Sequence, residues 1–283
     1  MMAKRIPTIL PNLTFKESLE VTKIHSIAGI LPAKFPLIIS RPFRSPHHTI
    51  SKASLIGGGR NPKPGEISLS HFGVLFLDEF TEFSKNTLEL LRTPVEDKLV
   101  TISRVNATLT YPCNFMLVAS MNPCPCGYYG SNSRKCTCSK NEISKYIGKI
   151  SGPLLDRIDI QIEVPRIKYE KLENVENTEN SANISSKVEK ARKIQLERYK
   201  KEGIFSNSEL TPNLIKQFCK IDEKGKDLLK NAFEKLGLSA RAYDRIIKVS
   251  RTIADLENKE NIEAKHIAEA IQYRSLDRKY WGN

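Results

Sequence analysis

Two groups of side chains in this 283-residue sequence have the residue types and spacing that chemistry requires. The first is the acidic pair Asp78 and Glu79, which directly follows the apolar run from Val74 to Leu77. Adjacent carboxylates are costly to bury unless a cation or hydrogen-bond donors offset their desolvation. In a Walker B motif, the Asp holds Mg²⁺ on a nucleotide and the Glu polarises the attacking water. The alternative is a strand that runs into a solvated acidic turn.

The second group is a set of four cysteines within fifteen residues, Cys124, Cys126, Cys136 and Cys138. Four thiolates satisfy the tetrahedral coordination of Zn²⁺, although paired zinc ligands are commonly separated by two or more residues and here by one. Two interpretations stay open, a zinc site and reduced structural cysteines in a surface insert. Disulfides are not expected, because a Lys-rich chain of this length is unlike a small disulfide scaffold.

The elements around the acidic pair predict an α/β domain with a parallel sheet. The run from Val74 to Leu77 is too short for a buried helix, and its composition is typical of a strand that is buried on both faces. Phe115 to Ser120 predicts a second buried strand, which leads to Asn122. Because open α/β sheets bind ligands at the carboxyl ends of their strands, Asn122 is placed to orient a water or bind a phosphate. It is equally well explained as a turn residue.

Further strands are expected at residues 35–40 and 160–164, and residues 99–111 predict a β-hairpin with a basic tip. Between the first two strands, residues 41–72 are rich in Arg, His, Gly and Pro and predict a long irregular loop. Its histidines, His47 and His48, fit contact with a metal or a nucleic acid, or ordinary loop positions.

The sequence also marks the starts and ends of several helices. A capping box at Thr14 predicts a helix through about Ala28. Ser84 is expected to cap a helix that Pro94 limits, and residues 3–10 read as the end of a helix.

The C-terminal part of the chain is predicted to be helical. Residues 166–185 are polar and rich in Glu and Asn, which is typical of a linker. The predicted domains are therefore an α/β domain over residues 1–165, a linker over 166–185 and a helical domain over 186–283. The helices are expected at residues 186–202, 209–220, 223–236, 240–257 and 263–273.

Charge and hydropathy narrow the choice of partners. The net charge is +13, and the first sixty residues hold nine basic and two acidic residues. This excess favours a polyanion, with nucleic acid ahead of a membrane surface. The sequence contains no apolar run of transmembrane length, and its first residues lack the apolar core of a signal peptide. We therefore expect a cytoplasmic protein with no membrane partner.

Taken together, these segments resemble the magnesium-chelatase-like AAA+ ATPases of the ComM/YifB family over essentially the whole chain. The residues that carry the resemblance form six motifs: Arg-Pro-Phe-Arg-Ser-Pro-His-His-Thr from Arg41, Gly-Gly-Gly-Arg-Asn-Pro-Lys-Pro-Gly-Glu-Ile-Ser-Leu from Gly57, Gly-Val-Leu-Phe-Leu-Asp-Glu-Phe from Gly73, Asn-Pro-Cys-Pro-Cys-Gly-Tyr-Tyr-Gly from Asn122, Ser-Gly-Pro-Leu-Leu-Asp-Arg-Ile-Asp from Ser151 and Leu-Ser-Ala-Arg-Ala-Tyr-Asp-Arg-Ile from Leu238.

The resemblance implies a P-loop NTPase-type AAA+ core with a helical lid, and the cofactors ATP and Mg²⁺. By the family's motifs, Asp78 and Glu79 match the Walker B pair and Asn122 matches sensor 1. Arg157 matches an arginine finger, which acts on a neighbouring subunit and so implies a hexameric ring. Arg241 matches sensor 2.

The family further implies a DNA helicase that acts in branch migration during transformation. Arg60, Lys63 and Arg104 match inserts that face the pore and contact DNA. This sequence departs from the family because the Walker A motif, expected immediately before Met1, is absent, as is the first sheet strand, so the AAA+ core is expected to be incomplete. A Lon-protease-like N-terminal domain is also absent, so we expect the C-terminal part of such a motor. The alternatives are a non-catalytic or vestigial fragment and a magnesium-chelatase subunit.

Overall fold

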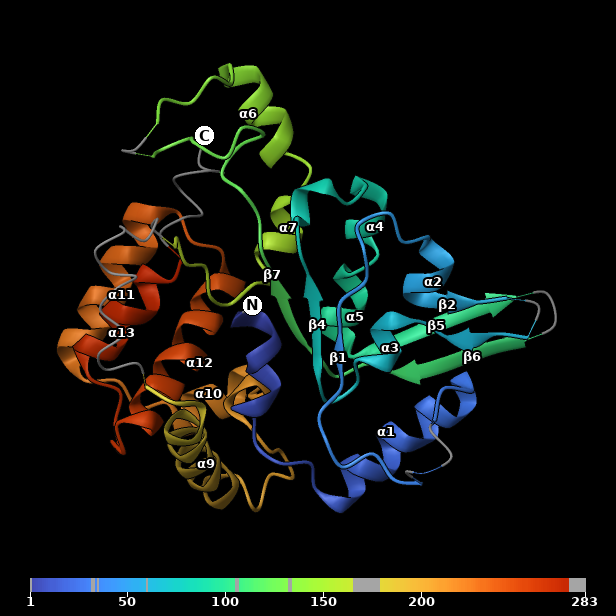
Figure 1. Cartoon of the computed structure of the whole chain (residues 1–283). Helices are drawn as coiled ribbons and strands as arrows, with labels where there is room; N and C mark the ends of the chain where they lie inside the picture. Colours follow the sequence, from blue (N-terminus) through green and yellow to red (C-terminus); the bar gives the residue numbers. More distant parts are fainter. Residues whose placement is uncertain are drawn as a thin grey trace. The chain divides into compact units, whose positions relative to one another are not determined.

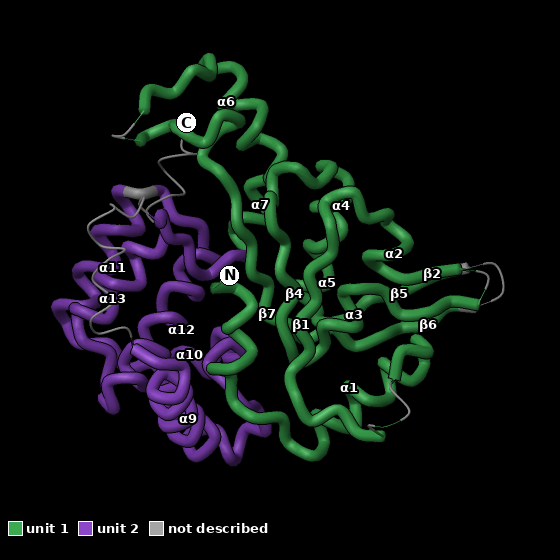
Figure 2. Tube along the Cα trace, in the orientation of Figure 1, with its two compact units in different colours: residues 1–157 green, residues 158–283 purple. Residues whose placement is uncertain are grey.

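A computed structural model of the chain describes residues 2–31, 34, 36–59, 61–104, 107–131, 134–164 and 179–274, without the side chains of residues 104, 107 and 236. The chain divides into two compact units, residues 1–157 and 158–283 (Figure 2). This division lies before residue 165, where the sequence predicted the end of the α/β domain. We describe each unit by itself.

The first unit is built on a three-stranded parallel sheet in the order β1-β4-β7 (Figure 1). The strands are β1 (Phe43–Arg44), β4 (Val74–Leu77) and β7 (Met116–Ala119). β4 is central, and every residue in it except Phe76 is fully buried. Burial of each such side chain contributes about 1.5–3 kcal/mol, which favours an unbroken apolar run in the middle of the sheet. The predicted mixed α/β class and the buried strand at Val74 are confirmed.

Short helices and two antiparallel hairpins complete this unit. The helices are η1 (Met2–Thr8), α1 (Phe15–Ala28), α2 (Lys52–Ile56), α3 (Glu66–Leu69), η2 (Phe80–Glu82), α4 (Lys85–Glu89), α5 (Arg92–Asp97), α6 (Lys140–Ile147) and α7 (Gly152–Leu155). The hairpins are β2 (Gly57–Gly58) with β3 (Lys63–Pro64), and β5 (Leu99–Arg104) with β6 (Ala107–Pro112). They lie side by side (Figure 1), and the Tyr111 hydroxyl donates a hydrogen bond of 3.1 Å to the Pro62 carbonyl.

Several local predictions are confirmed by the backbone. Thr14 and Glu17 form the capping box of α1, and Gly29 ends that helix in the left-handed conformation. The Ser84 side chain caps α4, as expected. The predicted hairpin over residues 99–111 is present as β5 and β6.

Other local predictions are wrong. Residues 36–40 form no strand, because the Ile38 N–H bonds the Thr22 hydroxyl and the edge strand begins only at Phe43. The supposed irregular loop over residues 41–72 contains β1, α2, β2, β3 and α3. Pro94 does not end a helix but lies in the first turn of α5, where its missing N–H costs little.

The strand predicted at residues 160–164 is also absent. Ile160, Ile162 and Val164 are 51%, 66% and 76% exposed, and the Gln161 N–H bonds the Tyr273 carbonyl. A strand requires a neighbour that satisfies its backbone groups in a ladder. Among the described residues, no such neighbour pairs with this segment.

The described part of the second unit consists mainly of helices. They are α9 (Ser181–Arg198), η3 (Asn207–Glu209), α10 (Pro212–Phe218), α11 (Glu223–Leu236), α12 (Ala240–Leu256) and α13 (Ala264–Gln272). The predicted bounds of the last three agree to within a residue, because Asp222 and Ser239 cap α11 and α12 and Gly237 ends α11. α9 begins five residues earlier than predicted, since its N-cap is Asn180.

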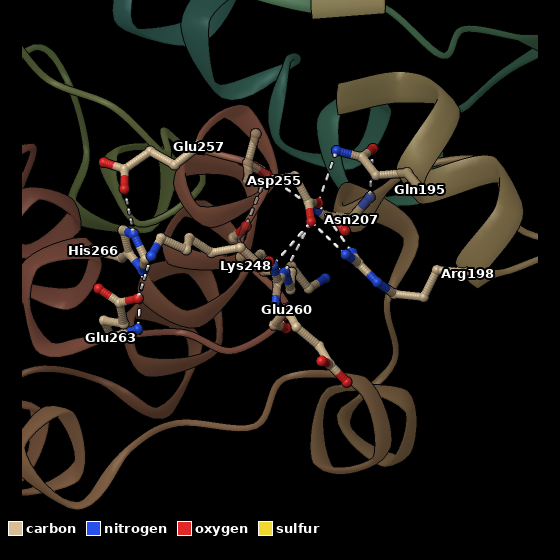
Figure 3. A network of polar contacts seen from close by, with 12 residues as sticks. Gln195, Arg198, Asn207, Lys248, Asp255, Glu257, Glu260, Glu263 and His266 are labelled. Carbon is tan, nitrogen blue, oxygen red and sulfur yellow. Dashed lines mark hydrogen bonds and ion pairs between the residues drawn. The ribbon is translucent and has the colours of Figure 1, made fainter. Parts of the chain in front are cut away.

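A buried polar network joins α9, η3 and α12 within this unit (Figure 3). Its centre is Asp255, which is 1% exposed and accepts hydrogen bonds from Gln195, Arg198, Asn207 and Arg251. The Arg251 side chain is completely buried, and it also donates to the backbone carbonyls at positions 259 and 260. A charge is tolerated inside a protein when it is paired and fully hydrogen-bonded, as this carboxylate is.

We predict that Asp255→Asn destabilises the helical unit by about 3–5 kcal/mol, because it leaves the buried Arg251 guanidinium without its counter-charge. Urea unfolding followed by far-ultraviolet circular dichroism measures the change. Glu223→Gln is the matched control, since it breaks an exposed pair with Lys226 and should leave the transition in place. An Asp255→Asn protein with wild-type stability would show that the network is dispensable.

Candidate functional site

The carboxyl end of β4 carries the acidic pair. The Ser120 hydroxyl, which follows β7, donates a hydrogen bond to the Asp78 carboxylate. Backbone hydrogen bonds extend the ladder past the strands, from the Ser120 N–H to the Leu77 carbonyl at 3.0 Å and from the Phe80 N–H to the Ser120 carbonyl at 2.8 Å. Asp78 and Glu79 are exposed. The parallel ladder therefore fixes both acids at an accessible edge, as ligand sites in such sheets require.

Glu79 lies beside a histidine to which the sequence assigned no specific role. Its carboxylate is 3.3 Å from His48 Nδ1, and the His48 ring meets the buried Phe83 ring edge-on. Glu79 itself has φ of +52°, a left-handed backbone that costs a non-glycine residue of order 1 kcal/mol or more. His48 lies shortly after β1. Its contact with Glu79 was not predicted, because that strand was expected at residues 35–40. The feature that could have identified this contact is the position of His48 after β1, which pairs in parallel with β4.

Asn122 follows β7 and is exposed. Its side-chain amide lies against Gly127, where an added Cβ would come within 3.9 Å of Asn122 Oδ1. Asn122 thus lies two residues after Ser120, in the segment that follows the sheet.

Arg157 lies at the end of the first unit and is 10% exposed at its side chain. Its guanidinium forms an ion pair with Glu96 and donates to the Pro153 carbonyl at 2.6 Å. Both Arg157 and Glu96 line an open cavity of about 250 Å³ together with Glu89, Arg92, Thr93 and Asp97. The pairing of Glu96 with this arginine was not predicted from the sequence.

The other predicted positions are spread over the molecule. Arg241 lies in the first turn of α12, in the second unit. Lys63 is exposed in β3, with its Nζ close to Gly29. Arg104 ends β5, but its side chain lies outside the described residues, as does all of Arg60.

The four cysteines come together as a candidate metal centre. Their sulfur atoms all lie within 4.8 Å of one another, and the Cys124 Sγ is 3.4 Å from Cys126 Sγ and 3.7 Å from Cys136 Sγ. Four sulfurs around one Zn²⁺ at about 2.3 Å stand about 3.8 Å apart. The thiol cluster therefore fits a tetrahedral metal ion.

The electrostatics of the cluster also suit a metal. A hydrogen bond from the Thr137 backbone lowers the pKa of Cys126 to about 5, which favours the thiolate form of this sulfur. Burial raises the pKa of Cys136, and the Cys126 and Cys124 sulfurs raise it further, whereas hydrogen bonds with Cys138 lower it. A divalent cation would replace the remaining protons, because thiolates are the form that ligates.

None of the described helices combines the length and hydropathy that a membrane crossing needs.

Comparison with known proteins agrees with these features. The family model described as magnesium chelatase, subunit ChlI, matches residues 1–172, and the model of its C-terminal part matches residues 178–274. The chain is 45% identical over 280 residues to the competence protein ComM of Haemophilus influenzae, covering 98% of this chain and 53% of the relative. It is 42% identical to the uncharacterized protein YifB of Escherichia coli, covering 98% of this chain and 54% of that protein.

The chain thus spans about half the length of the curated relatives it matches. The family models cover nearly all of it, including the acidic edge, the cysteine cluster and the helical unit. On this evidence the chain belongs to the magnesium chelatase, subunit ChlI family, in its ComM/YifB-like branch.

Proposed function

We propose that this chain supplies the magnesium and water-activating half of an AAA+ ATP hydrolysis site. The observation that carries the proposal is the acidic edge of the sheet, where Asp78 and Glu79 end β4 and Ser120 continues β7. Carboxylate and hydroxyl oxygens are the ligands that Mg²⁺ prefers, and Mg²⁺ usually keeps several waters and binds the phosphates of the nucleotide.

The residues have separate roles in this proposal. Asp78 holds the Mg²⁺ of MgATP, and its carboxylate is oriented by the Ser120 hydroxyl. Glu79 accepts the proton of the attacking water, since it is exposed and lies next to Asp78. Asn122 positions that water or the γ-phosphate. The bound magnesium supplies charge stabilisation to the transferring phosphoryl group.

We further propose that the active assembly is a hexameric ring. Arg157 would act as the finger on a neighbour's nucleotide, for which it has to exchange Glu96 for phosphate oxygens. Arg241 would act as a second sensor from the helical unit, which serves as the lid. The location in the cytoplasm remains a prediction from the sequence.

The first test concerns ATP turnover. The chain by itself should not hydrolyse ATP, because this sequence contains no Walker A motif to cradle the β- and γ-phosphates. When a P-loop segment of a family member precedes Met1, giving a P-loop-extended protein, turnover should appear. In that protein Glu79→Gln should lower kcat at least ~10²-fold and leave the KM for ATP unchanged, since a general base is lost and binding is kept.

Glu82→Gln is the control for this test, because Glu82 is an exposed acid three residues further on. It should turn over ATP at the wild-type rate. A Glu79→Gln variant with undiminished turnover would refute the proposed role of the acidic edge.

We propose DNA as the partner of this motor, in branch migration during transformation. The support is the charge of +13 together with the two adjacent hairpins, whose basic positions are Arg60, Lys63 and Arg104. One relative is named a competence protein, which agrees with a role in DNA uptake. Contacts to the phosphate backbone should carry little sequence preference.

A salt titration tests the DNA interface. Removing two phosphate contacts with Lys63→Ala and Arg104→Ala should reduce the slope of log affinity against log salt by about 1.8 for duplex DNA. Fluorescence anisotropy with a random duplex measures it. Lys226→Ala, an exposed lysine of the helical unit, should leave the slope unchanged. Equal slopes for the double variant and the wild type would remove the hairpins from the interface.

We propose that the metal of the cysteine cluster is Zn²⁺. The donor set is four sulfurs, which is the set that tetrahedral zinc takes in structural sites. The loop around it has little buried core, since Cys124 is the only buried residue among those described between positions 121 and 145. Structural zinc in comparable peptides stabilises the folded state by about 10–16 kcal/mol.

Metal analysis of the purified chain should find one zinc per molecule. Cys126→Ser combined with Cys138→Ser should remove it, because two ligands cannot hold a structural zinc. Cys113→Ser is the matched control, as Cys113 is buried outside the cluster. Unchanged zinc in the double variant would rule out this site, and iron in place of zinc would correct the identity of the metal.

A further inference from the structure

The segment that carries Asn122 is short and fixed at its start. Ser120 is held by a backbone hydrogen bond to Leu77 of β4, by one from Phe80 of η2 and by its hydroxyl contact with Asp78. Four positions later, Cys124 is completely buried in the cysteine cluster. Only residues 121–123 connect the sheet edge to the first sulfur ligand. The position of Asn122 therefore depends on both ends of this connection.

The far end of this connection lies at the sulfur cluster. The chain from position 121 to position 145 buries Cys124 alone among its described residues, so no apolar core fixes the loop. The Cys124 Sγ accepts a hydrogen bond from the Tyr129 N–H at 3.3 Å, and the Cys124 carbonyl accepts one from the Gly127 N–H at 2.9 Å. Both bonds turn the chain back around the cluster. A tetrahedral metal would lock this turn by tying positions 124 and 126 to positions 136 and 138.

The Asn122 side chain also lies near the same turn. Its side-chain amide faces Gly127, between Cys126 and Tyr128, at a distance where an added Cβ would make van der Waals contact. Gly127 has φ of +76°, a conformation that a glycine adopts without cost. The Asn122 amide and the turn of the cluster are therefore neighbours, as the three-residue connection requires.

We propose that the metal held by the four cysteines fixes Asn122, two residues beyond the Asp78 partner Ser120, so that metal loading controls the geometry of the candidate hydrolysis site. Because Cys124 and Cys138 would ligate the same ion, Cys138 helps to position Asn122 although it lies sixteen residues further along the chain. The assignment of this sheet edge as a nucleotide site rests on the proposed function. The coupling between the cluster and Asn122 does not, because it is a property of this chain without nucleotide.

Backbone ¹⁵N relaxation of the chain tests the coupling directly. With metal bound, the Asn122 N–H should have an order parameter near the rigid value of about 0.85, and after chelation it should fall below about 0.6. The N–H groups of Leu77 and Ala119 in the β4–β7 ladder should keep their order parameters in both states. Metal content is measured on the same samples, so that loss of the ion is established independently.

Cys138→Ser should reproduce the effect of chelation at Asn122, although it lies far away in sequence. Cys113→Ser should leave the Asn122 order parameter unchanged. Two results would overturn the proposal: an Asn122 that stays equally rigid after the metal is lost, or an equal loss of order in the β4–β7 ladder, which would show that the metal supports the whole unit. If the coupling is present and the P-loop-extended protein has no ATPase activity, the proposed function fails while this inference stands.

Discussion

The parallel pairing of β4 with β1 and β7 is the constraint on which the candidate site depends. The pairing aligns the carboxyl ends of three strands that are distant in sequence. It thereby brings Asp78 and Glu79 next to Ser120 on one side and next to His48 on the other. None of these contacts is local in sequence. Each follows from the register of the sheet, and the register is held by the buried side chains of β4.

The two units are stabilised in different ways. The first has an apolar strand at its centre, whereas the second combines an apolar cluster with the buried carboxylate of Asp255. An apolar strand tolerates changes of similar volume, but a buried charge depends on all of its partners at once. We therefore expect the helical unit to respond more sharply to single polar substitutions at its core than to conservative apolar ones.

Much of the fold could be predicted wherever a local signal decides the structure. Three predictions that depend only on residues within their own segment are confirmed: the strand from Val74 to Leu77, the capping box at Thr14 and the hairpin over residues 99–111. The wrong predictions concern segments whose structure depends on pairing with a distant strand. Residues 160–164 alternate like a strand, but among the described residues they have no strand partner.

The candidate site shows the same division. The acidic pair and the cysteine quartet could be predicted because their residues lie close together in the sequence. The contacts of Glu79 with His48 and of Arg157 with Glu96 could not, because they join positions 31 and 61 residues apart. Only the arrangement of the elements creates such pairs. Both contacts concern residues that the proposed function uses, and under that proposal both would have to rearrange.

The central claim is that the carboxyl end of β4 binds the magnesium of a nucleotide complex. This claim is tested by paramagnetic broadening of the NMR signals of the P-loop-extended protein by Mn²⁺ in the presence of ATP, with Mn²⁺ in place of Mg²⁺. We expect broadening centred on the amides of Asp78, Glu79 and Ser120, and its loss in Asp78→Asn. Broadening that is confined to other residues, or that is unchanged in Asp78→Asn, would contradict it.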